Sequence, residues 1–234
     1  MAFAVKGIYF YQGVIKSPDN LSLVRILADR MIQMYRHESG ENWEWFEGYL
    51  TYANSILPEA MLCAWLMTGD PVYRETAISS FAFLLSKTFN ANGIRVISNR
   101  SWLTRGAIAE QFGEQPIDVA YTIMALSKFY DVFRNEDYRQ KMETAFNWFL
   151  GKNHLHQIVY NPCTGGCYDG LEESHVNLNQ GAESTVSYLM ARLTVDKYYR
   201  TESPLKIKSV NHNRLHTHER ICYYSTGYKK QQTA

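Results

Sequence analysis

Three acidic residues, Glu47, Asp118 and Glu183, each stand near the start of a stretch with helical apolar periodicity. The N-terminus of a helix presents free N–H groups and a partial positive charge, which favour an ionised carboxylate. Such a carboxylate is a good base or hydroxyl acceptor, and a poorer acid. If the three helices are equivalent members of one ring, their carboxylates face the same end of one cavity, so they are the candidate catalytic residues. The alternative is that each only caps a helix, because first turns favour acidic residues for stability alone.

The neighbours of these acids are aromatic or amide side chains. Trp43 and Trp45 precede the first acid, Gln115 precedes the second, and Asn179 and Gln180 precede the third. Amides and carboxylates hydrogen-bond hydroxyl groups, and the face of an indole ring stacks on a pyranose. These five residues are therefore candidate substrate-binding residues for a polyhydroxylated ligand.

Glycoside hydrolysis generally needs two carboxyl groups, one of them a general acid with a raised pKa. A carboxyl in a loop suits this role better than one stabilised by a helix N-terminus. The stretch CYDGLEES supplies Asp169, Glu172 and Glu173, and we include Asp169 among the candidate binding residues. The alternative for all three is a solvated loop.

Helical periodicity dominates the elements that must position these residues, and the expected helices come in pairs. Short strands are possible within the loops, at residues 95–98 and 157–160. The expected helices cover about residues 1–15, 21–35, 45–67, 72–89, 116–133, 138–150 and 181–199.

A repeat with a period of 65 residues relates two of the helix pairs. Tyr73-Arg74 recurs as Tyr138-Arg139, and Phe81 recurs as Phe146. Repeated helical hairpins stack side by side because one hairpin cannot bury its apolar face alone. The alternative is a coincidence between two similar amphipathic helices. The loops between the hairpins, residues 90–115 and 151–180, are too long for a plain scaffold, and we expect them to build a site.

Composition excludes several classes of function. The 234 residues carry a formal net charge of +1, so we expect neither nucleic acid nor a membrane surface as a partner. Four cysteines and the absence of a signal-like N-terminal segment favour the cytoplasm. Cys163, Cys167 and His175 lack the second matched pair of a zinc site, and no phosphate loop or dinucleotide fingerprint is present, so we expect no metal and no cofactor.

Several stretches together resemble a known family: WEWFEGYLTYANSILPEAMLCAWLMTGDPVY, EQPIDVAYTIMAL, WFLGKN and TGGCYDGL followed by VNLNQGAEST. They are similar to the α/α-toroid domains of the six-hairpin glycosidase-like superfamily, especially those in or beside bacterial glycosyltransferases. The resemblance covers about residues 1–200 and implies a ring of inner and outer helices with a sugar-binding cleft where the inner helices begin.

The resemblance implies an all-α protein whose ring is incomplete, because a full toroid needs about twelve helices and about seven are expected here. Glu47, Asp118 and Glu183 would face the cleft. We expect a partial toroid at residues 1–200 and a polar, extended or disordered tail at residues 201–234. Besides a saccharide ligand, the expected partner is either a glycosyltransferase or a second chain that completes the ring.

The first hypothesis for function is a carbohydrate-active, glycoside hydrolase-like domain that binds a saccharide. The second is a non-catalytic saccharide-binding or accessory module that works with a glycosyltransferase. Sugar epimerases built on the same ring would need histidines on inner helices, and those helices contain none. A plain helical scaffold predicts that replacing the three acids changes stability by up to about 1 kcal/mol and leaves ligand affinity unchanged.

Overall fold

Helices account for most of the chain in the computed structural model, which describes residues 1–202. This confirms the prediction of an all-α protein, and one helix has the predicted bounds of residues 116–133. The tail predicted at residues 201–234 lies almost entirely outside the described residues. The helices are α1 (Ala2–Gln12), α2 (Pro18–Glu38), α3 (Ile56–Thr68), α4 (Pro71–Thr88), α5 (Pro116–Phe133), α6 (Glu136–Phe149) and α7 (Ala182–Glu202).

The predicted 65-residue repeat is confirmed at the turns of two helical hairpins. Gly69 follows the last residue of α3 and Arg134 follows the last residue of α5, and both have left-handed backbone conformations. The next residues, Asp70 and Asn135, cap α4 and α6 by accepting a hydrogen bond from the backbone N–H two residues later. The two hairpins are therefore built by the same local chemistry at equivalent positions.

Gly69 gives a test of this turn, because its φ of +75° disfavours any residue with a Cβ. We expect Gly69→Ala to lower the free energy of unfolding by about 1 kcal/mol. Gly7→Ala, in the middle of α1, should instead raise it by about 0.5–1 kcal/mol, because alanine is the better helix former. Neither added Cβ meets another atom within 4 Å, so the sign reports backbone conformation alone. Urea unfolding of both variants tests the prediction, and equal effects would contradict it.

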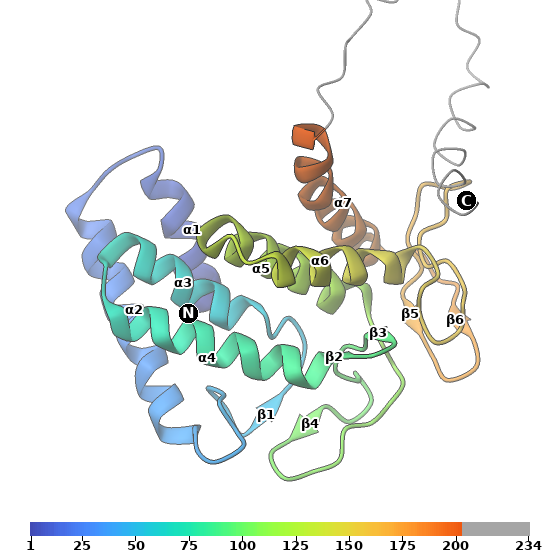
Figure 1. Ribbon diagram of the computed structural model, residues 1–234, viewed down its shortest axis with the longest axis horizontal. Helices are drawn as coiled ribbons and strands as arrows, with labels where there is room; N and C mark the ends of the chain where they lie inside the picture. Colours follow the sequence, from blue (N-terminus) through green and yellow to red (C-terminus); the bar gives the residue numbers. More distant parts are fainter. Residues whose placement is uncertain (203–234) are drawn as a thin grey trace, which may run out of the picture. The chain divides into compact units, whose positions relative to one another are not determined.

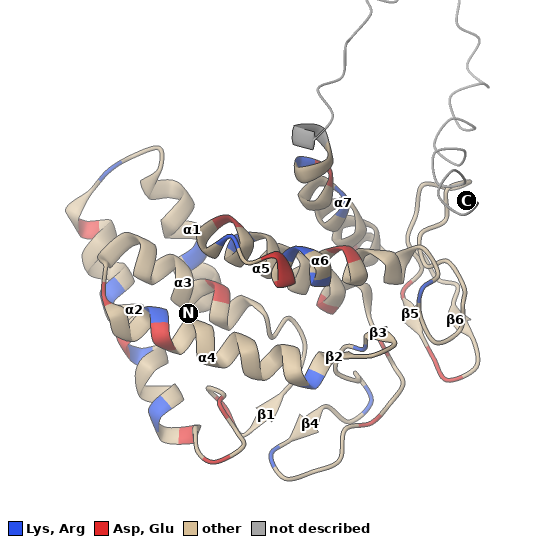
Figure 2. Cartoon of the chain, in the orientation of Figure 1, with Lys and Arg blue, Asp and Glu red and all other residues tan. Residues whose placement is uncertain are grey.

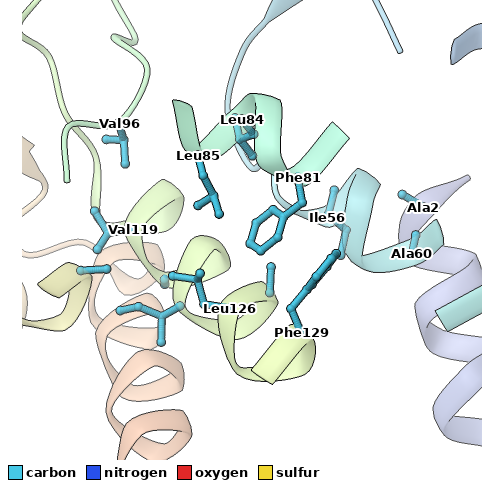
Figure 3. Packing of buried hydrophobic residues seen from close by; sticks show 14 of the residues in the cluster. Ala2, Ile56, Ala60, Phe81, Leu84, Leu85, Val96, Val119, Leu126 and Phe129 are labelled. Carbon is cyan, nitrogen blue, oxygen red and sulfur yellow. The ribbon is translucent and has the colours of Figure 1, made fainter. Parts of the chain in front are cut away.

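The core lies between the helices of neighbouring hairpins. Figure 3 shows Phe81 of α4 pointing toward Phe129 of α5, and their ring centroids are 4.3 Å apart. α3 packs against α1, α2, α4 and α5, so it is the most enclosed helix. Its residues Ala60 to Ala64 are all completely buried. Because this segment is apolar all round, its sequence lacks the one-sided pattern of a surface helix.

Within residues 1–202, short strands occur only in the connections beyond the helix ends (Figure 1). The strands predicted at residues 95–98 and 157–160 are wrong, because these residues run through the loops without forming a ladder. Three antiparallel two-residue pairs form instead. They are β1 (Tyr49–Leu50) with β4 (Leu103–Thr104), β2 (Phe89–Asn90) with β3 (Gly93–Ile94), and β5 (Gly170–Leu171) with β6 (Val176–Asn177).

The helix predicted at residues 45–67 is wrong in its first half, since α3 begins only at Ile56. Thr51 and Asn54 close a turn in which the Asn54 side chain accepts from the Thr51 N–H and donates to the Thr51 carbonyl. Ala53 in this turn has a φ of +51°, which a right-handed helix does not allow. Apolar residues in this segment fill the core from irregular backbone, and periodicity alone does not separate that case from a buried helix.

The surface of the described helices carries acidic and basic residues interspersed along the chain (Figure 2). None of these helices combines the length and the apolarity needed to cross a lipid bilayer. α7 packs on the preceding hairpin, where Tyr188 contacts Phe146 and Phe149 of α6 and Tyr198 hydrogen-bonds Ser127 of α5. This packing fixes the start of α7 beside the start of α5.

Candidate functional site

A polar pocket of about 270 Å³ lies where α5 and α7 begin. The two long loops, residues 90–115 and 151–180, contribute the rest of its lining, as their length predicted. Most of the lining side chains are carboxylates, amides or hydroxyls. The pocket is lined by Asn99, Glu114, Gln115, Asp169, Gly170, Glu172, Asn177, Gly181, Ala182, Glu183 and Ser184.

The two loops are joined by a backbone bridge that forms the wall of the pocket. Glu114 and Leu171 exchange two N–H to carbonyl hydrogen bonds, each 2.9 Å long. Gly170 is required beside this bridge, because a Cβ there would lie 2.5 Å from the Glu114 carbonyl oxygen. The bridge therefore fixes the last residues before α5 against the β5–β6 hairpin.

Glu114 is a buried carboxyl in this wall, and sequence reasoning missed it. Its side chain is 3% exposed, and its Oε2 accepts a hydrogen bond of 3.0 Å from the indole N–H of Trp148. Burial raises the pKa of Glu114, and the Trp148 hydrogen bond and the charges of His154 and Arg95 only partly oppose this effect. Burial thus favours the protonated form of Glu114, which is the direction that a general acid needs.

Asp169 lines the same pocket, but its surroundings favour the ionised form of the carboxyl. Its carboxylate accepts hydrogen bonds from the Gly181 N–H (2.8 Å), the Ser184 hydroxyl (2.7 Å) and the Asn179 amide. Burial opposes ionisation, but the hydrogen bonds from Ser184, Asn179 and Gly181 prevail and lower the pKa of Asp169. The expectation that Asp169 suits a general acid is therefore wrong: it is an ionised group that ties the loop to the start of α7.

Asp118, at the third position of α5, does not cap its own helix. Its Oδ1 accepts a 2.6 Å hydrogen bond from the N–H of Ala53, in the turn before α3. Burial raises the pKa of Asp118 to about 7, the Ala53 hydrogen bond opposes the rise, and the negative charge of Glu183 adds to it. The predicted ionised carboxylate at this helix start is thus wrong, because desolvation outweighs the helix N-terminus.

Glu183 lies in the first turn of α7, as predicted, and lines the pocket. Its side chain is exposed and makes no hydrogen bond or ion pair with any residue that the structure describes. Glu183 lies one repeat of 65 residues after Asp118, and its negative charge raises the pKa of Asp118. Glu183 is therefore a carboxylate with both oxygens available to a ligand.

Glu47 does not stand at a helix start and is not among the residues that line the pocket, because the segment before α3 is irregular. Burial and the nearby charge of Glu38 raise its pKa. Trp43 and Trp45, predicted to stack on a sugar, are buried instead. Trp43 packs on Phe83 and donates to the Glu47 carbonyl, so its ring belongs to the core.

Of the remaining predicted binding residues, one lines the pocket and two make hydrogen bonds outside it. Gln115 lines the pocket. Asn179 and Gln180 do not line it: Asn179 holds Asp169, and Gln180 accepts a hydrogen bond from Thr164. In addition to Glu114, the sequence reasoning missed Asn99, Asn177 and Ser184 as lining residues. Within residues 1–202, no three His, Cys, Asp or Glu side chains converge as they would to hold a metal ion.

No protein-family model matches the chain, and a search of curated proteins finds no significant relative.

Proposed function

We propose that the protein binds a saccharide in the pocket at the starts of α5 and α7 and acts on it as a glycoside hydrolase-like enzyme. One observation supports the proposal most directly: two carboxyl groups line the same pocket. Burial favours the protonated form of Glu114, and Glu183 makes no hydrogen bond or ion pair with any residue that the structure describes. Glycoside hydrolysis uses such a pair, one carboxyl in each protonation state. The amides and the hydroxyl around them suit the hydrogen-bonding pattern of a sugar.

In this proposal Glu114 is the acid that protonates the glycosidic oxygen as its bond to the anomeric carbon breaks. Glu183 is the second carboxylate, which activates water or attacks the sugar. Asp169 accepts sugar hydroxyls while it holds the start of α7, and Gln115 and Asn177 supply amide contacts. Asp118 lies beneath Glu183 as a structural residue, because its carboxyl is buried against Ala53.

The proposed architecture is the partial α/α toroid that the sequence resemblance implies. The alternating helical hairpins and their 65-residue repeat support it. The cytoplasm is the proposed location, from the low cysteine content of the sequence.

An accessory module that works with a glycosyltransferase is the second candidate, and one observation favours it. Val186, Leu189 and Leu193 lie along one face of α7 and are 52%, 48% and 67% exposed. Tyr188 and Val195, on another face of the helix, are buried in the preceding hairpins. An apolar face of this kind fits the idea that a partner chain extends the ring.

Ligand binding is tested by thermal stabilisation across a panel of monosaccharides and oligosaccharides. A sugar at about 100 times its Kd should stabilise the wild-type protein by about 2.7 kcal/mol, and Glu183→Gln should abolish most of that shift. Glu173→Gln is the matched control, because Glu173 is exposed on the loop that precedes α7 but does not line the pocket. Equal shifts for the two variants would place the sugar elsewhere.

Turnover separates the two candidates. For the sugar that binds, Glu114→Gln should lower the hydrolysis rate by about 10²–10⁴-fold while leaving the thermal shift in place, because the amide retains the shape but carries no acidic proton. Wild-type protein that binds the sugar and never hydrolyses it would identify the accessory module instead.

A further inference from the structure

The imidazole of His154 contacts the Glu114 carboxyl and has no role in the proposed function. Its Nδ1 is 3.2 Å from Glu114 Oε1, and its Nε2 is 2.8 Å from the backbone carbonyl oxygen of Glu172. The Phe112 ring covers the imidazole at a centroid distance of 5.3 Å. The side chain is thus fixed on three sides against the carboxyl that we propose as the acid.

The contacts of the ring determine where its protons are. A carbonyl oxygen only accepts hydrogen bonds, so Nε2 must carry the hydrogen that it donates to Glu172. Nδ1 is buried and makes no hydrogen bond of good alignment in the described part of the chain, so Glu114 Oε1 is its nearest candidate partner. A bare Nδ1 facing an ionised Oε1 would place two lone pairs together in a site of low dielectric, which is unfavourable.

We propose that Glu114 and His154 form a dyad that holds one proton between Oε1 and Nδ1. This inference rests on the proposed function for its use: Glu114 gives the proton to the leaving oxygen, and His154 is the positioning residue that orients the protonated carboxyl. The remaining contact of the carboxyl, from the Trp148 N–H to Oε2, leaves Oε1 as the oxygen that carries the proton.

The proton balance of a reaction cycle follows from this arrangement. When Glu114 protonates the leaving alcohol, a negative carboxylate remains in the wall of the pocket, where an uncompensated charge is costly. The His154 side chain is 15% exposed against 3% for Glu114, so the imidazole is the member closer to water. The proton that Glu183 takes from the attacking water leaves to solvent, and one proton from solvent returns to the dyad, so that Oε1 again carries a hydrogen that Nδ1 accepts. No oxidant or other reactant is consumed.

Other charges near the dyad bias where its proton lies. Arg95 favours the ionised form of Glu114, and the Arg100–Glu172 ion pair lies beside the carbonyl that holds Nε2. Burial of Glu114 acts in the opposite direction. The shared proton therefore belongs to the pair rather than to one residue.

The test is a pH titration of the full chain without sugar, by ¹⁵N NMR of labelled histidine and infrared spectroscopy of labelled glutamate. In the wild-type protein, the His154 ring and the Glu114 carboxyl should change at common midpoints, with Nε2 protonated throughout. In Glu114→Gln the His154 ring should titrate in a single step, because the carboxyl with which it shares a proton is lost. His175→Gln, on the same loop but exposed, controls for assignment of the signals.

Independent midpoints in the wild-type protein, or a hydrogen on Nδ1 with a bare Nε2, would overturn the dyad, and neither result depends on a variant that must fold. The titration contains no sugar, so its result does not depend on the proposed hydrolysis. If the titration is coupled but a separate assay finds no turnover of any 4-nitrophenyl glycoside, the dyad stands and only the proposed hydrolysis is contradicted. In an active preparation, His154→Gln should shift the alkaline limb of the kcat/KM profile, which a purely structural contact would leave in place.

Discussion

The Asp118→Asn variant is expected to be about 4 kcal/mol more stable than the wild-type protein at pH 9. This figure follows from a carboxyl whose pKa is about 7 in the folded protein and 3.8, its ordinary value, in the unfolded chain, a difference of about three pH units at 1.36 kcal/mol each. The cause is burial, since the ionised carboxylate must exist at pH 9 with one hydrogen bond, from Ala53, and a negative neighbour, Glu183.

The sign of this pH dependence is set by which state binds more protons. Between pH 3.8 and about 7 the folded protein keeps the proton on Asp118 while the unfolded chain has lost it. This contribution to stability therefore falls as pH rises through that window and is constant above it. Asparagine resembles the protonated carboxyl in shape and can accept from the Ala53 N–H, but it does not ionise.

Urea unfolding of both proteins from pH 5 to pH 9 measures the effect. The advantage of Asp118→Asn should grow up to about pH 7 and then level off. Glu183→Gln provides a second check, because removal of its negative charge should lower the pKa of Asp118 and reduce the difference between Asp and Asn. A stability difference that stays constant over this range would mean that Asp118 is ionised throughout.

The boundaries of the helical hairpins were predictable because their signals are local. Pro116 occupies the first turn of α5, and Asp70 and Asn135 each precede a helix as a cap, so neighbouring residues specify these starts. The start of α3 was not predictable in this way. It depends on the left-handed turn at Ala53 and on the bond from its N–H to Asp118, which lies 65 residues away.

In the candidate site, too, the residues with local sequence signals were predicted and those that depend on distant contacts were missed. Glu183 and Gln115 were found from their position at helix starts, and both line the pocket. Glu114 and His154 were missed because a charged residue in a loop is ordinarily solvated. The bridge from Glu114 to Leu171 fixes the position of this glutamate, and the register of such a bridge between two irregular loops leaves no periodic pattern in the sequence.

A second large effect is expected from Lys6→Met, at the contact between α1 and α3. Lys6 Nζ lies 2.8 Å from Glu59 Oε2, and the glutamate side chain is only 3% exposed. Burial already raises the pKa of Glu59, and the ammonium of Lys6 is the main opposing influence. Without it, Glu59 must either ionise without a partner or take up a proton. We expect the variant to lose about 3 kcal/mol of stability at pH 8.

Rescue by a second substitution distinguishes the charge from the packing of the lysine stem. Glu59→Gln in the Lys6→Met background should restore most of the lost stability, because no charge is then left buried. Lys16→Met, at an exposed lysine, should change the free energy of unfolding by less than about 0.5 kcal/mol. The loss in Lys6→Met should also shrink at pH 5, where protonation of Glu59 is less costly. If the double variant is no more stable than Lys6→Met, the contribution of Lys6 lies in its packing and not in its charge.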